Sequence, residues 1–185
     1  MGNPLLHRAP PEEFAARGQV IETEEELQLF PRLAEAVSGD FRAHAPEALP
    51  RKWRQTPVTI RLAFGWADTE HEIPVLEGRV SVRVPAVCQR CLEPFEQVLD
   101  TEVRLLFGAF GGRDDPSSQY GLWELEEATV RPVDILDESL VMAMPLAAMH
   151  ESSEDCGPLA KEVTVARDAG IRPFADLKSQ MRHKD

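Results

Sequence analysis

Residues 76–84 are Leu-Glu-Gly-Arg-Val-Ser-Val-Arg-Val, in which apolar and polar side chains alternate with the period of a β-strand that has one buried face. Residues 58–64 and residues 102–107 repeat this alternation on either side of that stretch. Three consecutive strands joined by short loops favour an antiparallel meander with one face in water. The pattern places four arginines on that exposed face: Arg61, Arg79, Arg83 and Arg104.

A short helix is predicted near the N-terminus, because Pro10-Pro11 precedes residues 12–16 and Gly18 follows them. Residues 19–22 then look extended. We expect a second helix that Thr23 caps, since Thr23 and Glu26 match a capping box. Apolar residues recur at helical spacing in this second helix, at Leu27, Phe30, Leu33, Ala34 and Val37, and Pro31 is expected to kink or split it.

A third helix is predicted to begin at Asp134. Asp137 and Glu138 would lie in its first turn, where carboxylates complement the helix dipole, and Pro145 would limit its length. The preceding stretch from Gly108 to Ser118 is rich in glycine, aspartate, proline and serine and is typical of an exposed, mobile loop.

These patterns predict an α+β fold: a central antiparallel β-meander with flanking short helices and a partly irregular C-terminal tail. Residues 1–150 would form a single α+β domain. Residues 151–185 would form the tail, irregular up to Arg172, with a short terminal helix that starts at Pro173. The 185 residues, of which 43% are hydrophobic, suffice for one compact domain.

Composition also constrains the location of the protein. No stretch approaches the roughly 20 apolar residues of a membrane helix, and the N-terminus does not resemble a signal peptide. The three cysteines are too few for a secreted disulfide framework, so reduced thiols are expected. We therefore expect a cytoplasmic protein that does not bind a membrane.

The charge is unevenly distributed along the chain. The net charge of −12 argues against DNA as a partner, because coating a duplex requires many basic residues. Residues 100–160 contain thirteen acidic residues and only three basic ones, all arginines. Residues 51–91 instead contain four acidic and seven basic residues. The basic residues are Arg51, Lys52, Arg54, Arg61, Arg79, Arg83 and Arg90. Such segregation permits a small basic face on an acidic protein.

Cys88 and Cys91 form a Cys-x-x-Cys pair, which commonly supplies half of a tetrahedral zinc site. His150 and Cys156 are the candidates for the remaining ligands, which gives a Cys, Cys, His, Cys set suited to structural zinc. Two alternatives stay open. The cysteines could simply be reduced thiols packed at a loop, or a redox pair, although a redox pair normally begins a helix after a strand.

Other enzyme signatures are absent from the sequence, including a glycine-rich phosphate loop, His-Glu-x-x-His and Gly-x-Ser-x-Gly. We therefore expect no enzymatic activity. The best local candidate for RNA contact is Arg51-Lys52-Trp53-Arg54, because aromatic rings beside basic residues can stack on unpaired bases. A partly buried indole at the entry to a strand is the alternative for Trp53.

The stretch Val87-Cys88-Gln89-Arg90-Cys91-Leu92-Glu93-Pro94-Phe95 resembles the bacterial YceD family, named for large ribosomal RNA subunit accumulation. Residues 140–150 followed by Cys156, and residues 172–177, fit the same resemblance in the same order. The likeness runs from about Gln19 to the end of the chain. Other branches of the family carry further downstream cysteines that residues 156–159 lack, so any zinc site must close with His150 or with water.

The resemblance implies a non-enzymatic accessory factor in synthesis, processing or stability of 23S ribosomal RNA. It implies precursor 23S rRNA or a large-subunit assembly particle as the partner. On this hypothesis the residues that face RNA are Arg51, Lys52, Trp53, Arg61, Arg79, Arg83 and Arg90. The alternative is an acidic adaptor that binds a basic ribosomal protein or an assembly enzyme, because the acidic segment would attract basic partners.

Overall fold

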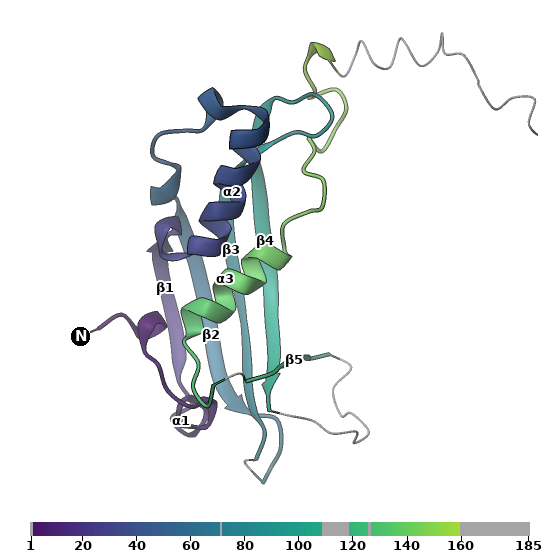
Figure 1. Ribbon diagram of the computed structural model, residues 1–185. Coiled ribbons are helices and arrows are strands. Elements are labelled where there is room, and N and C mark those ends of the chain that lie inside the picture. Colours follow the sequence, from purple (N-terminus) through teal and green to yellow (C-terminus); the bar gives the residue numbers. More distant parts are fainter. Residues whose placement is uncertain (1, 71, 109–118, 126, 160–185) are drawn as a thin grey trace, which may run out of the picture.

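A five-stranded sheet with the strand order β1-β2-β3-β4-β5 forms the centre of the fold (Figure 1). The structure is a computed structural model and describes residues 2–70, 72–108, 119–125 and 127–159. The strands are β1 (Val20–Glu26), β2 (Pro57–Trp66), β3 (Pro74–Val87), β4 (Pro94–Phe107) and β5 (Gly121–Trp123). The first four pair antiparallel in sequence order, whereas β5 pairs parallel with β4. The predicted meander and the α+β class are confirmed.

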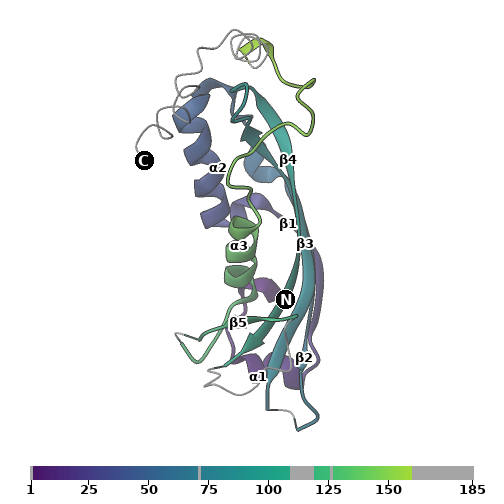
Figure 2. The ribbon, with the colours of Figure 1, turned by 90° about the vertical axis from the view of Figure 1, so that its right-hand side faces the viewer.

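Helices cover one face of this sheet (Figure 2). They are α1 (Pro11–Ala16), α2 (Pro31–His44) and α3 (Pro132–Met142), together with short 3₁₀ turns at Pro4–Leu6, Leu27–Leu29, Pro46–Ala48 and Trp53–Gln55. The main core lies between α2, α3 and the sheet, where Phe41 and Leu136 pack with strand residues such as Ile60 and Val80. The other face of the sheet carries the four predicted arginines, all exposed.

The prediction for residues 23–37 is wrong in its first part. Thr23 and Glu26 belong to β1, which pairs with β2 from Val20↔Ala63 to Glu26↔Pro57. The helix α2 begins only at Pro31, which therefore does not kink it. Proline is favoured at the first helical position because the N–H it lacks has no partner there. Pairing with β2 thus outweighed the local capping pattern.

The prediction for the first turn of α3 is also wrong, because the helix begins at Pro132. Asp137 lies in its interior, 3% exposed, and its carboxylate accepts hydrogen bonds from the backbone N–H groups of Arg32 and Leu33, each at 2.9 Å. These N–H groups belong to the first turn of α2. Asp137 therefore complements the N-terminus of the neighbouring helix and not that of its own.

Some sequence-based predictions lie outside the described residues. They are the mobile loop at residues 109–118 and the terminal helix at residues 173–177.

Among the described residues, no helix is long and apolar enough to cross a membrane. The parallel strand β5 was not predicted, since three residues are too short for a periodic pattern.

Candidate metal centre

The Cys-x-x-Cys pair lies in the turn of the β3–β4 hairpin. Pairing between the two strands continues through Pro85 to Val87↔Pro94, so only residues 88–93 form the turn. Cys88 donates its backbone N–H to the carbonyl of Glu93 at 2.9 Å, and Leu92 donates to the carbonyl of Cys88 at 2.8 Å. The hairpin thus holds both cysteines at the end of the sheet.

The chain after α3 returns to this turn. Its extended path is the yellow-green segment beside the β3–β4 turn in Figure 1. The backbone N–H of Gln89 donates to the carbonyl of Ala148 at 2.8 Å, which fixes the two segments to each other. His150 follows two residues later, and Cys156 is buried against the turn.

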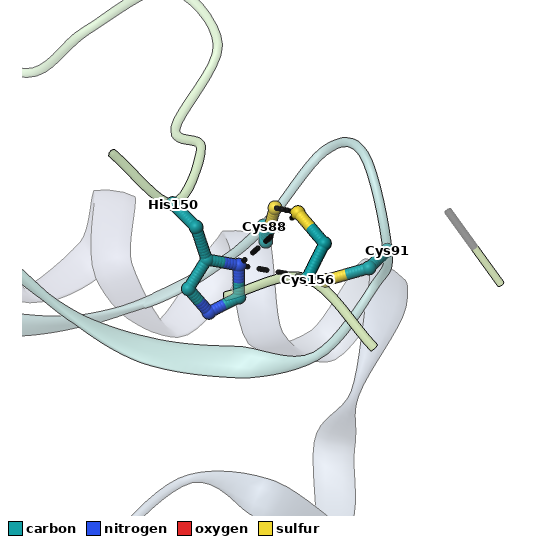
Figure 3. A group of neighbouring side chains, drawn as sticks. All are labelled: Cys88, Cys91, His150 and Cys156. Carbon is teal, nitrogen blue, oxygen red and sulfur yellow. Dashed lines mark hydrogen bonds between the residues drawn. The ribbon is translucent and has the colours of Figure 1, made fainter. Parts of the chain in front are cut away.

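Four side chains meet where the two segments touch (Figure 3). One ligand atom from each of Cys88, Cys91, His150 and Cys156 lies within 4.8 Å of all the others. The Sγ atoms of Cys88 and Cys156 are 4.0 Å apart. The Nδ1 atom of His150 lies 3.5 Å from the Sγ of Cys91 and 3.7 Å from that of Cys156. The structure therefore brings all four predicted ligands together.

Three of the six ligand–ligand separations are close to those around a tetrahedral zinc ion, and the others are at most 4.8 Å. Bonds of about 2.3 Å to sulfur and about 2.0 Å to nitrogen place tetrahedral ligands roughly 3.8 Å apart for two sulfurs and roughly 3.5 Å apart for sulfur and nitrogen. All three cysteines are free and at most 3% exposed, and His150 is half-buried. Three thiolates and an imidazole in a nearly dry site are a donor set that favours zinc over magnesium or calcium.

The backbone around the site already favours a thiolate at Cys88. Burial by itself raises the pKa of this thiol, but hydrogen bonds from the backbone N–H groups of His150, Arg90 and Cys91 outweigh it and lower the pKa to about 6. Burial, reinforced by the neighbouring sulfurs of Cys88 and Cys91, raises the pKa of Cys156 to about 11. The two thiols therefore differ in charge at neutral pH when no metal is bound.

The two alternatives for the cysteines differ in how well they fit this geometry. The pair lies in a turn between two strands and not at the start of a helix, which is where a thioredoxin-like redox pair belongs. Packed thiols remain compatible with the structure, since the cysteines and Phe95 form a small apolar cluster separate from the main core. The presence of His150 in contact with two of the sulfurs distinguishes the site from a purely apolar cluster.

The predicted RNA-facing residues separate into two groups. Arg61 pairs with Glu22 at 3.0 Å, and Arg79 binds Asp100 through two hydrogen bonds of 2.6 Å. Within the described part of the chain, no carboxylate lies in salt-bridge distance of the second group, which consists of Arg51, Lys52, Arg83 and Arg90. The structure therefore does not bring the seven residues into one uniform basic face.

Trp53 is largely buried. Its side chain is 7% exposed and belongs to the main core, and the guanidinium of Arg54 lies 5.0 Å from the centre of its ring. The indole therefore offers only a small part of its surface to solvent. The packing of Trp53 matches the alternative prediction of a buried indole at the entry to a strand.

Phe95 is a residue of this region whose role the sequence reasoning missed. Its ring centre lies 4.8 Å from that of His150, so it packs directly against a candidate ligand. An aromatic residue four positions after Cys91 was the only available signal, and it gives no hint of a contact with a histidine 55 residues away.

Part of this chain is similar to known proteins. Residues 76–179 match the family described as "Large ribosomal RNA subunit accumulation protein YceD". A curated protein of that name from Haemophilus influenzae is 33% identical over 93 residues, which are 49% of this chain and 53% of that protein. The chain thus spans about half the length of this relative. No solved structure matches. The family match contains all four residues of the candidate metal centre.

Proposed function

The chain belongs to the YceD family, and from that premise we propose that it is a non-enzymatic accessory factor for the accumulation of 23S ribosomal RNA. The observation that carries the proposal is the match over residues 76–179. This range contains β4, α3 and all of β3 except its first two residues, as well as the two segments that form the candidate metal centre. The partner we propose is precursor 23S rRNA or a large-subunit assembly particle in the cytoplasm.

Zinc is the metal that we propose for the four-residue site, in a structural role. The ion would join the β3–β4 turn to the segment that follows α3, two parts of the chain separated by about sixty residues. Four protein ligands leave no position for a water or substrate, which is characteristic of structural and not of catalytic zinc. A metal site with four protein ligands therefore supports a binding role for the protein and not a catalytic one.

The proposal is tested by removal of the gene from its own cell. We expect the ratio of large-subunit to small-subunit ribosomal RNA to fall and a plasmid carrying the wild-type gene to restore it. An unchanged ratio would contradict the proposed function. To test the non-enzymatic role, purified protein is incubated with precursor RNA, which is expected to stay intact.

An acidic adaptor remains the second candidate. One observation favours it: the ion pairs of Arg61 and Arg79 reduce the positive charge of the exposed sheet face. In addition, β1 at the edge of the sheet carries exposed Glu22, Glu24 and Glu26. Capture of one basic ribosomal protein by purified chain that binds no RNA would support the adaptor over direct RNA contact.

A further inference from the structure

A cavity of ≈ 460 Å³ lies beside the metal centre. It exists because β3 is longer than its neighbour: the last pair between β2 and β3 is Val58↔Val82, and residues 83–87 pair with β4 alone. The segment before β2 forms no ladder pair with residues 83–87. Residues 48–56 of that segment and residues 83–96 of the hairpin line the cavity together.

Part of the lining of this cavity is apolar. Trp53 and Phe95 contribute aromatic rings, and Pro50, Pro85 and Pro94 contribute side chains with little conformational freedom. The core holds Trp53 in place. A preformed apolar wall binds a planar ligand at a lower entropic cost than mobile side chains would. The volume lies within the range of about 300–1,000 Å³ that is usual for small-ligand pockets.

Two cations line the same cavity, Lys52 and Arg83. Neither has a carboxylate in salt-bridge distance among the described residues, and Glu96 is the one acidic residue of the lining. The arginines on the middle of the sheet, Arg61 and Arg79, are already paired. The cavity therefore retains positive charge that the rest of the exposed face has lost.

A second cavity, of ≈ 350 Å³, has a different character. It contains Arg8, Arg32 and Arg131, but each of these pairs with a carboxylate of the same lining: Glu127, Glu138 and Asp134, respectively. Its charges are satisfied internally, so it has no evident preference for an anion.

We propose that the cavity beside the metal centre binds one unpaired nucleotide of RNA. The base packs against Phe95 and the small exposed part of Trp53, and Lys52 and Arg83 contact the phosphates that flank it. This inference rests on the proposed function, which makes RNA the partner. Aromatic walls next to basic side chains suit a single strand, because every base presents an apolar face and its backbone a negative charge.

A duplex fits this cavity poorly. Its bases are stacked inside the helix, and its binding relies on many phosphate contacts, whereas the cavity supplies two cations on a protein of net charge −12. The occupant must therefore be a loop, a bulge or a single-stranded end, which are the usual targets of specific RNA recognition.

The metal centre and the cavity share a wall. Phe95 lines the cavity and also packs against His150, 4.8 Å between ring centres. Metal bound at the four ligands would fix His150 and thereby the ring that the base contacts. Nucleotide binding is accordingly expected to weaken when the metal is removed.

The test uses the purified full chain and a fluorescently labelled single-stranded RNA oligonucleotide of mixed sequence, with the same sequence as a blunt duplex. The double variant Lys52→Gln with Arg83→Gln removes the two cavity cations. The matched control, Arg61→Gln with Arg79→Gln, removes the same charge from the paired arginines of the same face. We expect the cavity variant to bind the single strand roughly tenfold more weakly, and the control to change affinity by less than about threefold.

A second variant tests the apolar wall. Phe95→Leu keeps an apolar side chain of similar size but removes the aromatic face, so we expect a several-fold loss of single-strand affinity. Zinc content and circular dichroism equal to wild type would establish that this variant is folded.

Three results would overturn the inference: equal weakening by the cavity and control variants, tighter binding of the duplex than of the single strand, or no binding of either RNA. None of these bears on the fall in large-subunit RNA after gene removal, which tests the proposed function by itself. Failure of RNA binding with a positive gene-removal result would indicate a protein partner instead.

Discussion

Phe95 packs against His150 with 4.8 Å between the centres of their rings, and the two residues belong to segments that come together at the candidate metal centre. His150 faces two cysteine sulfurs on one side, and Phe95 lines the adjacent cavity. The contact links the candidate metal centre to the cavity that we propose binds RNA. Metal binding at the four ligands and RNA binding at the cavity can be measured separately.

The first prediction concerns zinc. Purified protein is expected to contain one zinc ion per chain, measured by elemental analysis after dialysis. Cys88→Ser and Cys156→Ser should reduce this content to near zero, because each removes a ligand from a closed site. The matched control is His44→Ala, which changes a histidine on α2 outside the cluster and should leave the content at one. Zinc-free wild-type protein would contradict the metal assignment.

Metal removal should also lower thermal stability. A ligand present at a hundred times its dissociation constant stabilises the folded state by about 2.7 kcal/mol. For a chain of this size, that corresponds to a fall in Tm of roughly 5–10 °C when a chelator is added. Differential scanning calorimetry measures the change. The same chelator should leave the Tm of the Cys88→Ser variant unaltered.

A third prediction concerns the charge of the metal-free thiols. Because backbone N–H groups lower the pKa of Cys88 to about 6, one thiolate should form as the pH rises through 6. The pKa of Cys156 is about 11, so this thiol should stay protonated at neutral pH. Ultraviolet absorbance of the thiolate, followed during a pH titration of apoprotein, reports both. The early step should vanish in Cys88→Ser; a wild-type titration without any thiolate below pH 8 would refute the assignment.

The fourth prediction concerns Asp137, the one buried charged residue of the described chain. Asp137→Ala leaves the backbone N–H groups of Arg32 and Leu33 without their acceptor, so unfolding free energy should fall by about 2 kcal/mol. Asp134→Ala, an exposed carboxylate of the same helix, should cost less than about 1 kcal/mol. Urea denaturation of both variants measures the difference, and equal losses would refute the tertiary cap.

Comparison of predicted and observed placements for particular residues shows how far the sequence could predict the structure. The alternation at residues 76–84 correctly identified a central strand, because a one-sided sheet requires it. The four candidate metal ligands, which the structure brings together, were also identified from cysteine spacing and a family resemblance. Thr23 and Asp137 were misassigned because their partners, β2 and α2, are distant in sequence, and a local pattern carries no information about such pairing.

The sequence could not show which of the residues predicted to face RNA are paired with carboxylates. Counting basic residues cannot distinguish Arg79, which Asp100 neutralises across the β3–β4 ladder, from Arg83, which lies beside the cavity. The cavity itself arises from the unequal lengths of β2 and β3, and this difference appears only when the strands are paired. The charge of residues 51–91 therefore indicated the region of the proposed RNA site but did not identify the residues that line the cavity.

The most direct test of the account is ultraviolet crosslinking of the protein to RNA in living cells, followed by denaturing purification and sequencing of the attached RNA. We predict enrichment of precursor 23S ribosomal RNA with wild-type protein and a marked loss with the Lys52→Gln, Arg83→Gln variant. Recovery of no ribosomal RNA above the level of an uncrosslinked sample would contradict direct action on RNA.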